Sequence, residues 1–390
     1  MIDWRPSARA LASTLVASGT VRTPAWHAAF ENTPRHVFVP QWYDTENGRN
    51  VLVRADDPVQ RDRWWSAIYA DTVLVTQVLS PPSASGEDTA HLPTSSSTMP
   101  GIMAWMLEAL DVHDGQRVLE IGTGTGYNTA LLCQRLGPAH VVSVDIDPGL
   151  VEQARERLAS LEFAPTLIVG DGAENPVDSG PFDRIISTAA VDHIPPVWIE
   201  QLTLGGLIVT DLRGSMTGAI SILRKTADDL VEGVFDPFDA AFMPLRPRSG
   251  TPLQRGSTPG VLMDTRNPHT STTDIDPTCV LDNRDFRFLL QLHLAGIDID
   301  FFSTGDEVVG LARDGAWVKT RTTPLPDGRH HVEQGGPRRV WDTVDSAYAL
   351  WRLTHNPTID RFGTTATTDR TRQRVWLDEP HSHHKWPLPL

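Results

Sequence analysis

The chain has 390 residues, of which 40% are hydrophobic and 21% are charged. This length allows two or three domains, each with its own core. Its 34 basic and 49 acidic side chains give a net charge of −15. That excess of acid disfavours non-specific binding to nucleic acid and to anionic membranes.

The two cysteines, Cys133 and Cys279, lie far apart in the sequence. They form neither a disulfide framework nor a zinc motif, so we expect a reducing, cytoplasmic location. The run ALASTLVASG differs from a signal peptide because Asp3 precedes it and Ser and Thr interrupt it. No stretch approaches the roughly 18 apolar residues that a membrane span needs.

The first part of the chain predicts helices followed by an irregular segment. Leu11 and Leu15 recur at helical spacing, so residues 1–40 are expected to be helical. Residues 41–93 are rich in Asp, Pro and Ser around one strand-like run, DTVLVTQVL. We therefore expect an N-terminal helical and irregular cap region over residues 1–98.

From residue 99 the pattern changes to alternation of helix and strand. The expected elements are a helix over 101–110, the strand RVLEIG, the helix NTALLCQRL, the strand HVVSVDI, the helix GLVEQARERLASL, the strands PTLIVGD and FDRIISTAA, the helix PPVWIEQL and the strand GGLIVTDL. Short β-rich runs separated by amphipathic helices indicate parallel strands joined by right-handed crossovers. The predicted fold class is α/β, with a doubly wound open sheet over residues 99–246.

A linker and a second domain are expected to follow. The stretch RPRSGTPLQRGSTPG is dense in Pro, Gly and Ser, and it predicts a linker over residues 247–260. Beyond it, RFLLQLHLAGIDIDFF predicts a helix or strand and then a strand, and EVVGLARDGAWVKTR predicts two strands around an Asp-Gly turn. Thr343 is a possible cap for a helix in TVDSAYALWRLTHN. Residues 261–390 should therefore form a smaller C-terminal α+β domain.

The run VLEIGTGTGYNTALL carries the strongest local signal. A hydrophobic strand ends at Glu120, and Gly122, Gly124 and Gly126 then allow a tight turn into a helix. Glycine lets the backbone adopt positive φ and approach a ligand closely. The G-x-G-x-G spacing differs from the G-x-G-x-x-G of dinucleotide sites, so a nicotinamide cofactor is the less favoured alternative.

Acidic residues end the next two strands. Asp145 is placed to accept hydrogen bonds from ribose hydroxyls, and Asp171 is placed to accept one from an adenine amine. Open α/β sheets bind ligands at the carboxyl ends of their strands. We therefore expect S-adenosylmethionine as the cofactor and S-adenosylhomocysteine as its product. The expected cofactor-binding residues are Glu120, Gly122, Thr123, Gly124, Gly126, Asp145, Ile146, Asp171, Gly172 and Thr188.

These residues resemble the protein L-isoaspartyl (D-aspartyl) O-methyltransferase family. The likeness extends over residues 30–210 and includes PRHVFVP, IYADTVLVTQ, TSSSTMPGIMAWMLEAL, VLEIGTGTGYNTALL, the acidic end of the second strand, VGDGA and PFDRIISTAAVDHIPPVWIEQLTLGGLIV. The resemblance implies a Rossmann-like class I methyltransferase sheet and methyl transfer to a carboxylate.

The hydroxyl run TSSST, residues 94–98, stands directly before a predicted helix. An N-cap accounts for Thr98 but not for the serines. In the family this place holds a Gly-Gln-Thr-Ile-Ser-type run whose last hydroxyl is the supposed catalytic group. The resemblance implies Thr98 as the principal donor to the substrate carboxylate. We expect Ser97 and Ser96 as assisting donors and Ser95 as a substrate contact, and the alternative for the serines is an elaborate helix cap in a Ser-rich loop. A carboxylate is ionised at neutral pH, so no strong general base is expected.

Two departures from the family pattern suggest a special substrate. The segment before the hydroxyl run is expanded, and a further domain of about 130 residues follows the last strand. In both respects the chain resembles variants from actinobacterial ribosomal peptide pathways, including graspetide, lanthipeptide and lasso peptide clusters. That resemblance implies methylation of an Asp side chain in a constrained peptide, such as a macrocyclised precursor, followed by collapse of the ester to an aspartimide.

Further residues are weaker candidates. His193, near the end of the fourth strand, could contact substrate, or it could be an ordinary solvated loop histidine. Arg338 and Arg339 could hold an acidic peptide, or they could belong to an ordinary turn and strand. The tract HSHH at 381–384 has no Cys or acidic partners nearby, so we expect no metal site.

Three functions stay open on the sequence alone. The leading hypothesis is a peptide aspartate O-methyltransferase, and the second is isoaspartyl repair of damaged proteins. The expanded segment and the extra domain disfavour repair, because a repair enzyme must admit many unrelated flexible sequences. A third hypothesis is a non-catalytic cofactor-binding scaffold, which the intact Asp145 and Asp171 positions disfavour.

Overall fold

The computed structural model describes residues 3–46, 49–79, 92–174, 177–246 and 267–389. The chain divides into two compact units. The first comprises Met1–Ala189, Glu200–Thr210 and Phe242–Thr251, and the second comprises Ala190–Ile199, Asp211–Ala241 and Pro252–Leu390. These compact units differ from the expected division over 99–246 and 261–390, because residues from both stretches contribute to the second unit. The expected linker, 247–260, lies outside the described residues.

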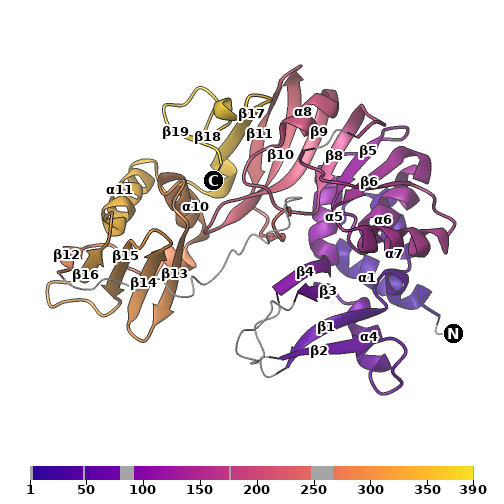
Figure 1. Cartoon of the computed structure of the whole chain (residues 1–390), viewed down its shortest axis with the longest axis horizontal. Coiled ribbons are helices and arrows are strands. Elements are labelled where there is room, and N and C mark those ends of the chain that lie inside the picture. Colours follow the sequence, from indigo (N-terminus) through magenta and orange to yellow (C-terminus); the bar gives the residue numbers. More distant parts are fainter. Residues whose placement is uncertain (1–2, 47–48, 80–91, 175–176, 247–266, 390) are drawn as a thin grey trace. The chain divides into compact units, whose positions relative to one another are not determined.

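The first unit contains the expected parallel sheet. Its strands lie in the order β9 (Leu202–Arg213), β8 (Phe182–Ser187), β5 (Val118–Ile121), β6 (Val141–Asp145) and β7 (Thr166–Val169). All four neighbouring pairs are parallel. Helix α5 (Pro100–Ala109) precedes β5, α6 (Tyr127–Leu136) and the short η1 (Pro138–His140) lead to β6, α7 (Pro148–Ala159) leads to β7, and α8 (Pro196–Gln201) precedes β9 (Figure 1). This arrangement confirms the α/β fold class.

Helices precede this sheet in the chain, as expected. They are α1 (Arg5–Ala17), α2 (Pro24–Asn32), α3 (Arg35–Phe38) and α4 (Arg61–Ile68). Helix α1 contacts α2 and α5, and α2 contacts α6. Leu11 and Leu15, which carried the helical periodicity, are both buried. The hydrophobic face of α1 thus packs toward α2 and α5.

A small antiparallel sheet replaces the irregular segment expected over residues 41–93. Its order is β2 (Arg49–Arg54), β1 (Gln41–Glu46), β3 (Leu74–Leu79) and β4 (Leu92–Ser97). Only the run DTVLVTQVL was predicted as a strand. The other strands gave no clear signal because each buries few apolar side chains, such as Trp42 in β1 and Val53 in β2. Strand β4 consists largely of the hydroxyl run.

The second unit contains an antiparallel set of strands in the order β10 (Gly218–Ala227), β11 (Leu230–Asp236), β17 (Phe362–Thr367), β18 (Arg374–Leu377) and β19 (Lys385–Pro387). The short helices η2 (Ile359–Arg361) and η3 (Arg370–Arg372) flank β17. The last strands of the chain therefore pair with β11 instead of joining the α+β domain, a non-local pairing that no local pattern predicts.

The α+β domain itself is confirmed within the second unit. Its antiparallel sheet has the order β12 (His269–Thr273), β16 (His330–Gly335), β15 (Trp317–Arg321), β14 (Glu307–Ala312) and β13 (Ile299–Thr304). Helices α9 (Cys279–Asp282), α10 (Arg284–His293) and α11 (Val340–Leu353) complete it. Phe286, Val318 and Trp341 belong to its core. The proposed cap at Thr343 is wrong, because buried Val340 and Trp341 already belong to α11 and Arg339 is the N-cap.

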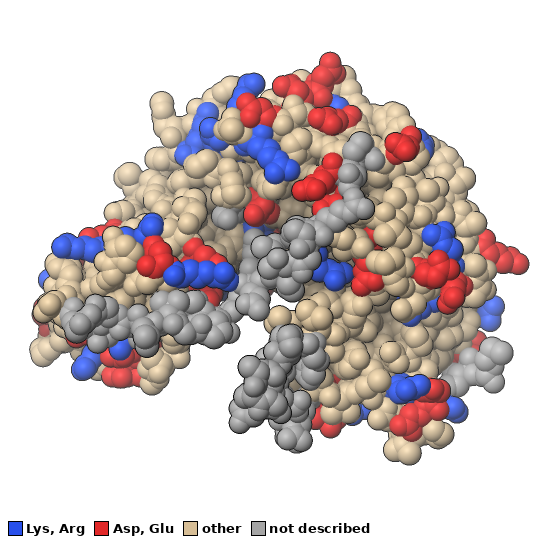
Figure 2. All heavy atoms as spheres, viewed as in Figure 1, with Lys and Arg blue, Asp and Glu red and all other residues tan. Residues whose placement is uncertain are grey.

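None of the helices in the described part of the chain has the length and hydrophobicity that crossing a bilayer requires. On the face shown in Figure 2, basic and acidic side chains are interspersed over a largely uncharged surface. The net charge of −15 is therefore not gathered there into one acidic field.

A buried arginine fixes the end of the hydroxyl strand β4. The side chain of Arg35, the first residue of α3, is 0% exposed. Its guanidinium donates hydrogen bonds to the carbonyl oxygens of Ile68 (3.1 Å), Ala70 (3.0 Å), Thr72 (3.1 Å), Ser97 (3.4 Å) and Thr98 (3.2 Å), and to Ser97 Oγ (3.3 Å). Burial lowers the pKa of Arg35 to about 10, so the group is still a cation at neutral pH.

Helix α5 begins without the hydroxyl cap that Thr98 was expected to supply. Met99 is the N-cap residue, and its side chain makes no capping bond. Asp71, from the loop before β3, takes this role because its Oδ1 accepts from the Gly101 amide at 2.7 Å. Pro100 is the first helical residue, as expected. The Thr98 side chain is therefore not used as a cap.

Glu120 ties α6 to β5 from inside the protein. Its side chain is 0% exposed; Oε1 accepts from Asn128 Nδ2 at 2.8 Å, and Oε2 accepts from Thr129 Oγ1 at 2.5 Å. Burial raises the pKa of Glu120 to about 7, although these hydrogen bonds act in the opposite direction. The expectation that Glu120 contacts the cofactor is therefore revised, because its side chain positions the helix that follows the glycine turn.

Replacing Arg35 should destabilise the first unit. Arg35→Met leaves buried carbonyl oxygens without a donor, at about 1–3 kcal/mol for each unsatisfied group. We expect the midpoint of thermal unfolding to fall by about 6 °C or more. Arg54→Met, which breaks an exposed ion pair with Asp56, is the control and should change it by less than about 2 °C. An R35M melting curve that overlays the wild-type curve would contradict this role.

Glu120 should make stability depend on pH. Its pKa is about 7 in the folded chain, against an ordinary value of 4.5 for a glutamate side chain. The unfolded chain therefore ionises first, and the free energy of unfolding falls as pH rises from about 4.5 to about 7, by on the order of 3 kcal/mol. The Glu120→Gln variant has no carboxyl group to ionise, so it does not lose this stability. The melting temperature of the variant minus that of wild type should therefore rise from about pH 4.5 to about pH 7 and stay constant above pH 7. Exposed Glu156→Gln is the control. A difference that is constant from pH 4.5 to 8 would refute the shift.

Candidate functional site

The glycine turn joins β5 to α6. Gly122, Gly124 and Gly126 have φ values of 95°, 52° and 86°, a region that side chains with a Cβ rarely adopt. Gly126 is the N-cap of α6, and a Cβ added there would lie 3.0 Å from Ala154 Cβ on α7. The turn therefore needs these glycines both for its backbone conformation and for close packing against α7.

Asp145, at the end of β6, reaches this turn. It is 8% exposed; Oδ2 accepts from the Gly124 amide at 2.9 Å, and Oδ1 accepts from the Asp147 amide at 3.0 Å. Burial raises its pKa, while those two N–H groups act to lower it. A carboxylate has about four acceptor positions, so the two bonds leave Asp145 able to accept from ribose hydroxyls as well.

The loop after β7 returns to the end of β5. Asp171 is 3% exposed and accepts from the Ala173 amide at 2.9 Å. A Cβ on Gly172 would lie 2.8 Å from the Ile121 side chain. The expected adenine-binding residues thus lie next to the strand end that precedes the glycine turn, and Ile146 directly follows Asp145 in the chain.

Two threonines of the expected cofactor set support the backbone of the turn. The Thr188 hydroxyl donates to the Gly122 carbonyl at 2.7 Å, and a Cβ on Gly122 would overlap it at 2.5 Å. Thr123 Oγ1 and Ser143 Oγ are 2.7 Å apart, and both residues are buried. These hydroxyls have partners inside the protein and support the turn, and contact of Thr123 and Thr188 with the cofactor stays a prediction.

The hydroxyl strand β4 lies beside the same turn. A methyl group built on Gly124 would be 3.8 Å from both Ser95 Oγ and the Ser96 carbonyl oxygen. Ser95 and Ser97 are buried, whereas Ser96 and Thr98 are partly exposed, as alternation along a strand requires. Ser97 Oγ accepts from Arg35. The structure thus gives Ser97 an inward partner and leaves Ser96 and Thr98 with access to solvent.

Gln77, which the sequence did not single out, connects the hydroxyl strand to the cofactor edge. Its carboxamide oxygen accepts from Thr94 Oγ1 at 2.7 Å, and its Nε2 donates to Asp147 Oδ2 at 3.2 Å. Asp147 caps α7 through the Gly149 and Leu150 amides, and its own amide donates to Asp145. A continuous chain of hydrogen bonds therefore runs from β4 to the expected ribose acceptor.

The remaining candidates belong to the second unit. His193 Nδ1 and Asp192 Oδ1 are 2.6 Å apart. Arg338 is paired with Asp314 at 2.7 Å, and Arg339 lies 3.9 Å from Asp342. Both guanidiniums therefore already have carboxylate partners in their own domain, which weakens the interpretation of this pair as an acidic-peptide site.

In the part of the chain that the structure describes, no group of three or more His, Cys, Asp or Glu side chains could hold a metal ion. That finding includes the HSHH tract. The residues at the carboxyl ends of β5, β6 and β7 instead fit an adenosine cofactor. The glycine turn has no side chains to keep a ligand away, Asp145 and Asp171 supply buried carboxylate oxygens, and Asp145 can accept further hydrogen bonds.

Comparison with known proteins places this site in a family. Residues 58–249 match the family described as Protein-L-isoaspartate(D-aspartate) O-methyltransferase (PCMT). The Protein-L-isoaspartate O-methyltransferase of Ignicoccus hospitalis is 32% identical over 203 residues, which are 52% of this chain and 79% of that protein. The one from Methanothermobacter thermautotrophicus is 31% identical over 233 residues, which are 59% of this chain and 89% of that protein.

A solved structure titled Protein-L-isoaspartate O-methyltransferase superposes with a TM-score of 0.54 at 20% identity. The match covers 95% of this chain and 100% of that chain, and at this identity it concerns the fold alone.

The glycine turn, the acidic strand ends and the similarity to these relatives agree: the chain belongs to the protein-L-isoaspartate(D-aspartate) O-methyltransferase family, and it is an S-adenosylmethionine-dependent carboxyl O-methyltransferase.

Proposed function

We propose that the chain methylates the free carboxylate of an isoaspartyl residue in a peptide or protein. The observation that carries this proposal is the position of β4, whose Ser95 hydroxyl lies against the glycine turn at Gly124. Hydroxyl donors therefore border the place where the cofactor is expected. Relatives of which this chain covers 79% and 89% bear the name of this activity.

The protein has to bind two partners and orient them. The turn at 122–126, Asp145 and Asp171 would hold S-adenosylmethionine, which supplies a methyl group on a sulfonium that needs no further activation. An aspartyl-type carboxylate is ionised at neutral pH, so the chain need not remove a proton from it. Orientation and exclusion of water are the contributions left to the protein.

Thr98 and Ser96 are the residues we assign to orientation. Both are partly exposed and alternate with buried Ser95 and Ser97. Their hydroxyls can donate to one carboxylate oxygen and leave the other oxygen free to react. Ser97 acts as a positioning residue, because its hydroxyl and carbonyl are bonded to Arg35.

A second candidate substrate is an ordinary aspartate in a ribosomally made, modified peptide, including a macrocyclised precursor. The hydroxyl strand favours it, because TSSST stands where family repair enzymes usually carry a Gly-Gln-Thr-Ile-Ser-type run. In that reaction the methyl ester would be attacked by the next backbone nitrogen, with loss of methanol and formation of an aspartimide.

Peptides of one sequence distinguish these functions. The purified chain is given S-adenosylmethionine and three versions of a peptide that carry isoaspartate, aspartate or asparagine at one position, and mass spectrometry follows the gain of one CH2 unit. We expect methylation of the isoaspartyl peptide alone. Methylation of the aspartyl version, followed by loss of methanol, would instead support the modified-peptide substrate. Asparagine is the control without a carboxylate.

The Thr98 hydroxyl should affect turnover more than folding. Thr98→Val removes one hydrogen bond to a charged group, worth about 1.5–3 kcal/mol, so kcat should fall by about 10- to 100-fold. Thr98→Ser should recover most of the rate. Thr45→Val, at an exposed position of β1, is the matched control. Unchanged kcat in T98V, with unchanged melting temperature, would remove Thr98 from the mechanism.

A further inference from the structure

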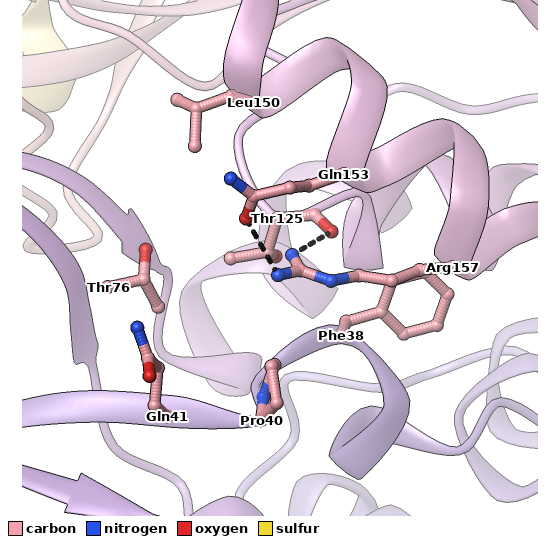
Figure 3. Close-up of a pocket in the computed structure, with 8 residues that line it drawn as sticks. All are labelled: Phe38, Pro40, Gln41, Thr76, Thr125, Leu150, Gln153 and Arg157. Carbon is pink, nitrogen blue, oxygen red and sulfur yellow. Dashed lines mark hydrogen bonds between the residues drawn. The ribbon is translucent and has the colours of Figure 1, made fainter.

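A pocket lies on the α7 side of the glycine turn. Its volume is about 280 Å³, and it is lined by Phe38, Pro40, Gln41, Thr76, Thr125, Leu150, Gln153 and Arg157 (Figure 3). Sites for whole small molecules usually measure about 300–1,000 Å³. A pocket of this size suits one side chain of a larger ligand better than a free cofactor.

Arg157 is the one charged residue among the lining residues. Its Nη1 donates to the Thr125 carbonyl at 3.2 Å and its Nη2 to Gln153 Oε1 at 3.0 Å. Both acceptors are neutral, and no ion pair joins Arg157 to a carboxylate among the described residues. Its helix neighbour Arg155 differs, because it pairs with Glu152 at 3.3 Å. Glu156 attracts the Arg157 charge without pairing with it, so the guanidinium has no carboxylate in hydrogen-bond contact although the net charge of the chain is −15.

The walls of the pocket offer further polar groups. Figure 3 shows Thr76 and Gln41 across the pocket from Gln153 and Arg157, with Leu150, Phe38 and Pro40 as apolar wall residues. A guanidinium has five N–H donors, and the two hydrogen bonds above leave others for a ligand. A carboxylate on a short aliphatic stem matches this combination of cation, amides and apolar walls.

The pocket is adjacent to the hydroxyl strand. Thr76 Oγ1 donates to Ser95 Oγ at 3.3 Å, and Thr125 is part of the glycine turn. From Ser95 to Thr98 an extended backbone advances by about 10 Å, or three residues. A peptide with its reacting carboxylate at Thr98 could therefore place a side chain about three residues away in this pocket.

We propose that the Arg157 pocket binds an acidic side chain of the methyl-accepting peptide, about three residues from the residue that is methylated. The pocket is then a specificity site, which selects substrates with an acidic residue at that distance. This inference rests on the proposed function, because it assumes a peptide substrate bound along β4.

Arg157 could instead serve only to hold the glycine turn through Thr125. The two roles predict different measurements. A purely structural role would weaken the binding of S-adenosylhomocysteine and of every peptide alike, whereas a specificity role changes the ratio of affinities for acidic and neutral peptides.

Calorimetry on the full chain loaded with S-adenosylhomocysteine tests the pocket without turnover. The probes are isoaspartyl peptides with Glu or Gln three residues before or after the isoaspartate. We expect one Glu peptide to bind about 10-fold more tightly than its Gln partner. In Arg157→Gln this ratio should fall to about 1, and in the matched control Arg155→Gln it should stay at about 10. Arg157→Lys, which keeps the charge without the fork, should give an intermediate ratio.

Two results would overturn the proposal. One is equal affinity of wild type for the Glu and Gln peptides at both positions. The other is a Glu preference that survives in R157Q, including the case in which R157Q binds both peptides more weakly by the same factor. Methyl transfer is measured separately on the Gln peptides, so its absence would refute the proposed function while the affinity ratio still decides the role of the pocket.

Discussion

The buried guanidinium of Arg35 is the interaction on which the site depends. It gathers carbonyl oxygens from residues 68–72 and from the end of β4 around one cation. A buried cation must have such partners, because an unpaired one costs several kcal/mol. The chain can satisfy Arg35 only if β4 ends where it does. That requirement places Ser97 and Thr98 at a fixed distance from the first residues of α5, where Asp71 supplies the cap.

Hydrogen bonds then connect this strand to the cofactor edge. Gln77 joins Thr94 to Asp147, and the Asp147 amide reaches Asp145, which in turn holds the Gly124 amide. Each group is held by its neighbours before a ligand arrives. Such preorganisation matters for methyl transfer, because the reaction needs alignment more than activation. The Arg157 pocket lies beside the same strand through the Thr76–Ser95 hydrogen bond, and in our proposal it adds substrate selection to this arrangement.

The parts of the fold that the sequence predicted are those with local signals. The glycine turn, the acidic strand ends and the helix periodicity of α5 to α7 are each readable within a few residues. The β1–β4 sheet was missed because its strands bury few apolar side chains, and the return of β17–β19 to β11 was missed because it is a non-local pairing. Glu120 was assigned to the cofactor from its position alone, yet its side chain turns inward to Asn128 and Thr129. The roles of Arg35, Gln77 and Arg157 depend on partners far away in the sequence, so no motif could reveal them.

A crystal structure with S-adenosylhomocysteine and an isoaspartyl peptide tests the central claim most directly. The account predicts ribose hydroxyls on Asp145, adenine beside Asp171, and the peptide carboxylate within hydrogen-bond distance of Thr98 Oγ1, between that hydroxyl and the sulfur. A complex in which the sulfur faces away from β4, or in which the carboxylate binds elsewhere while Thr98 contacts only water, would contradict it.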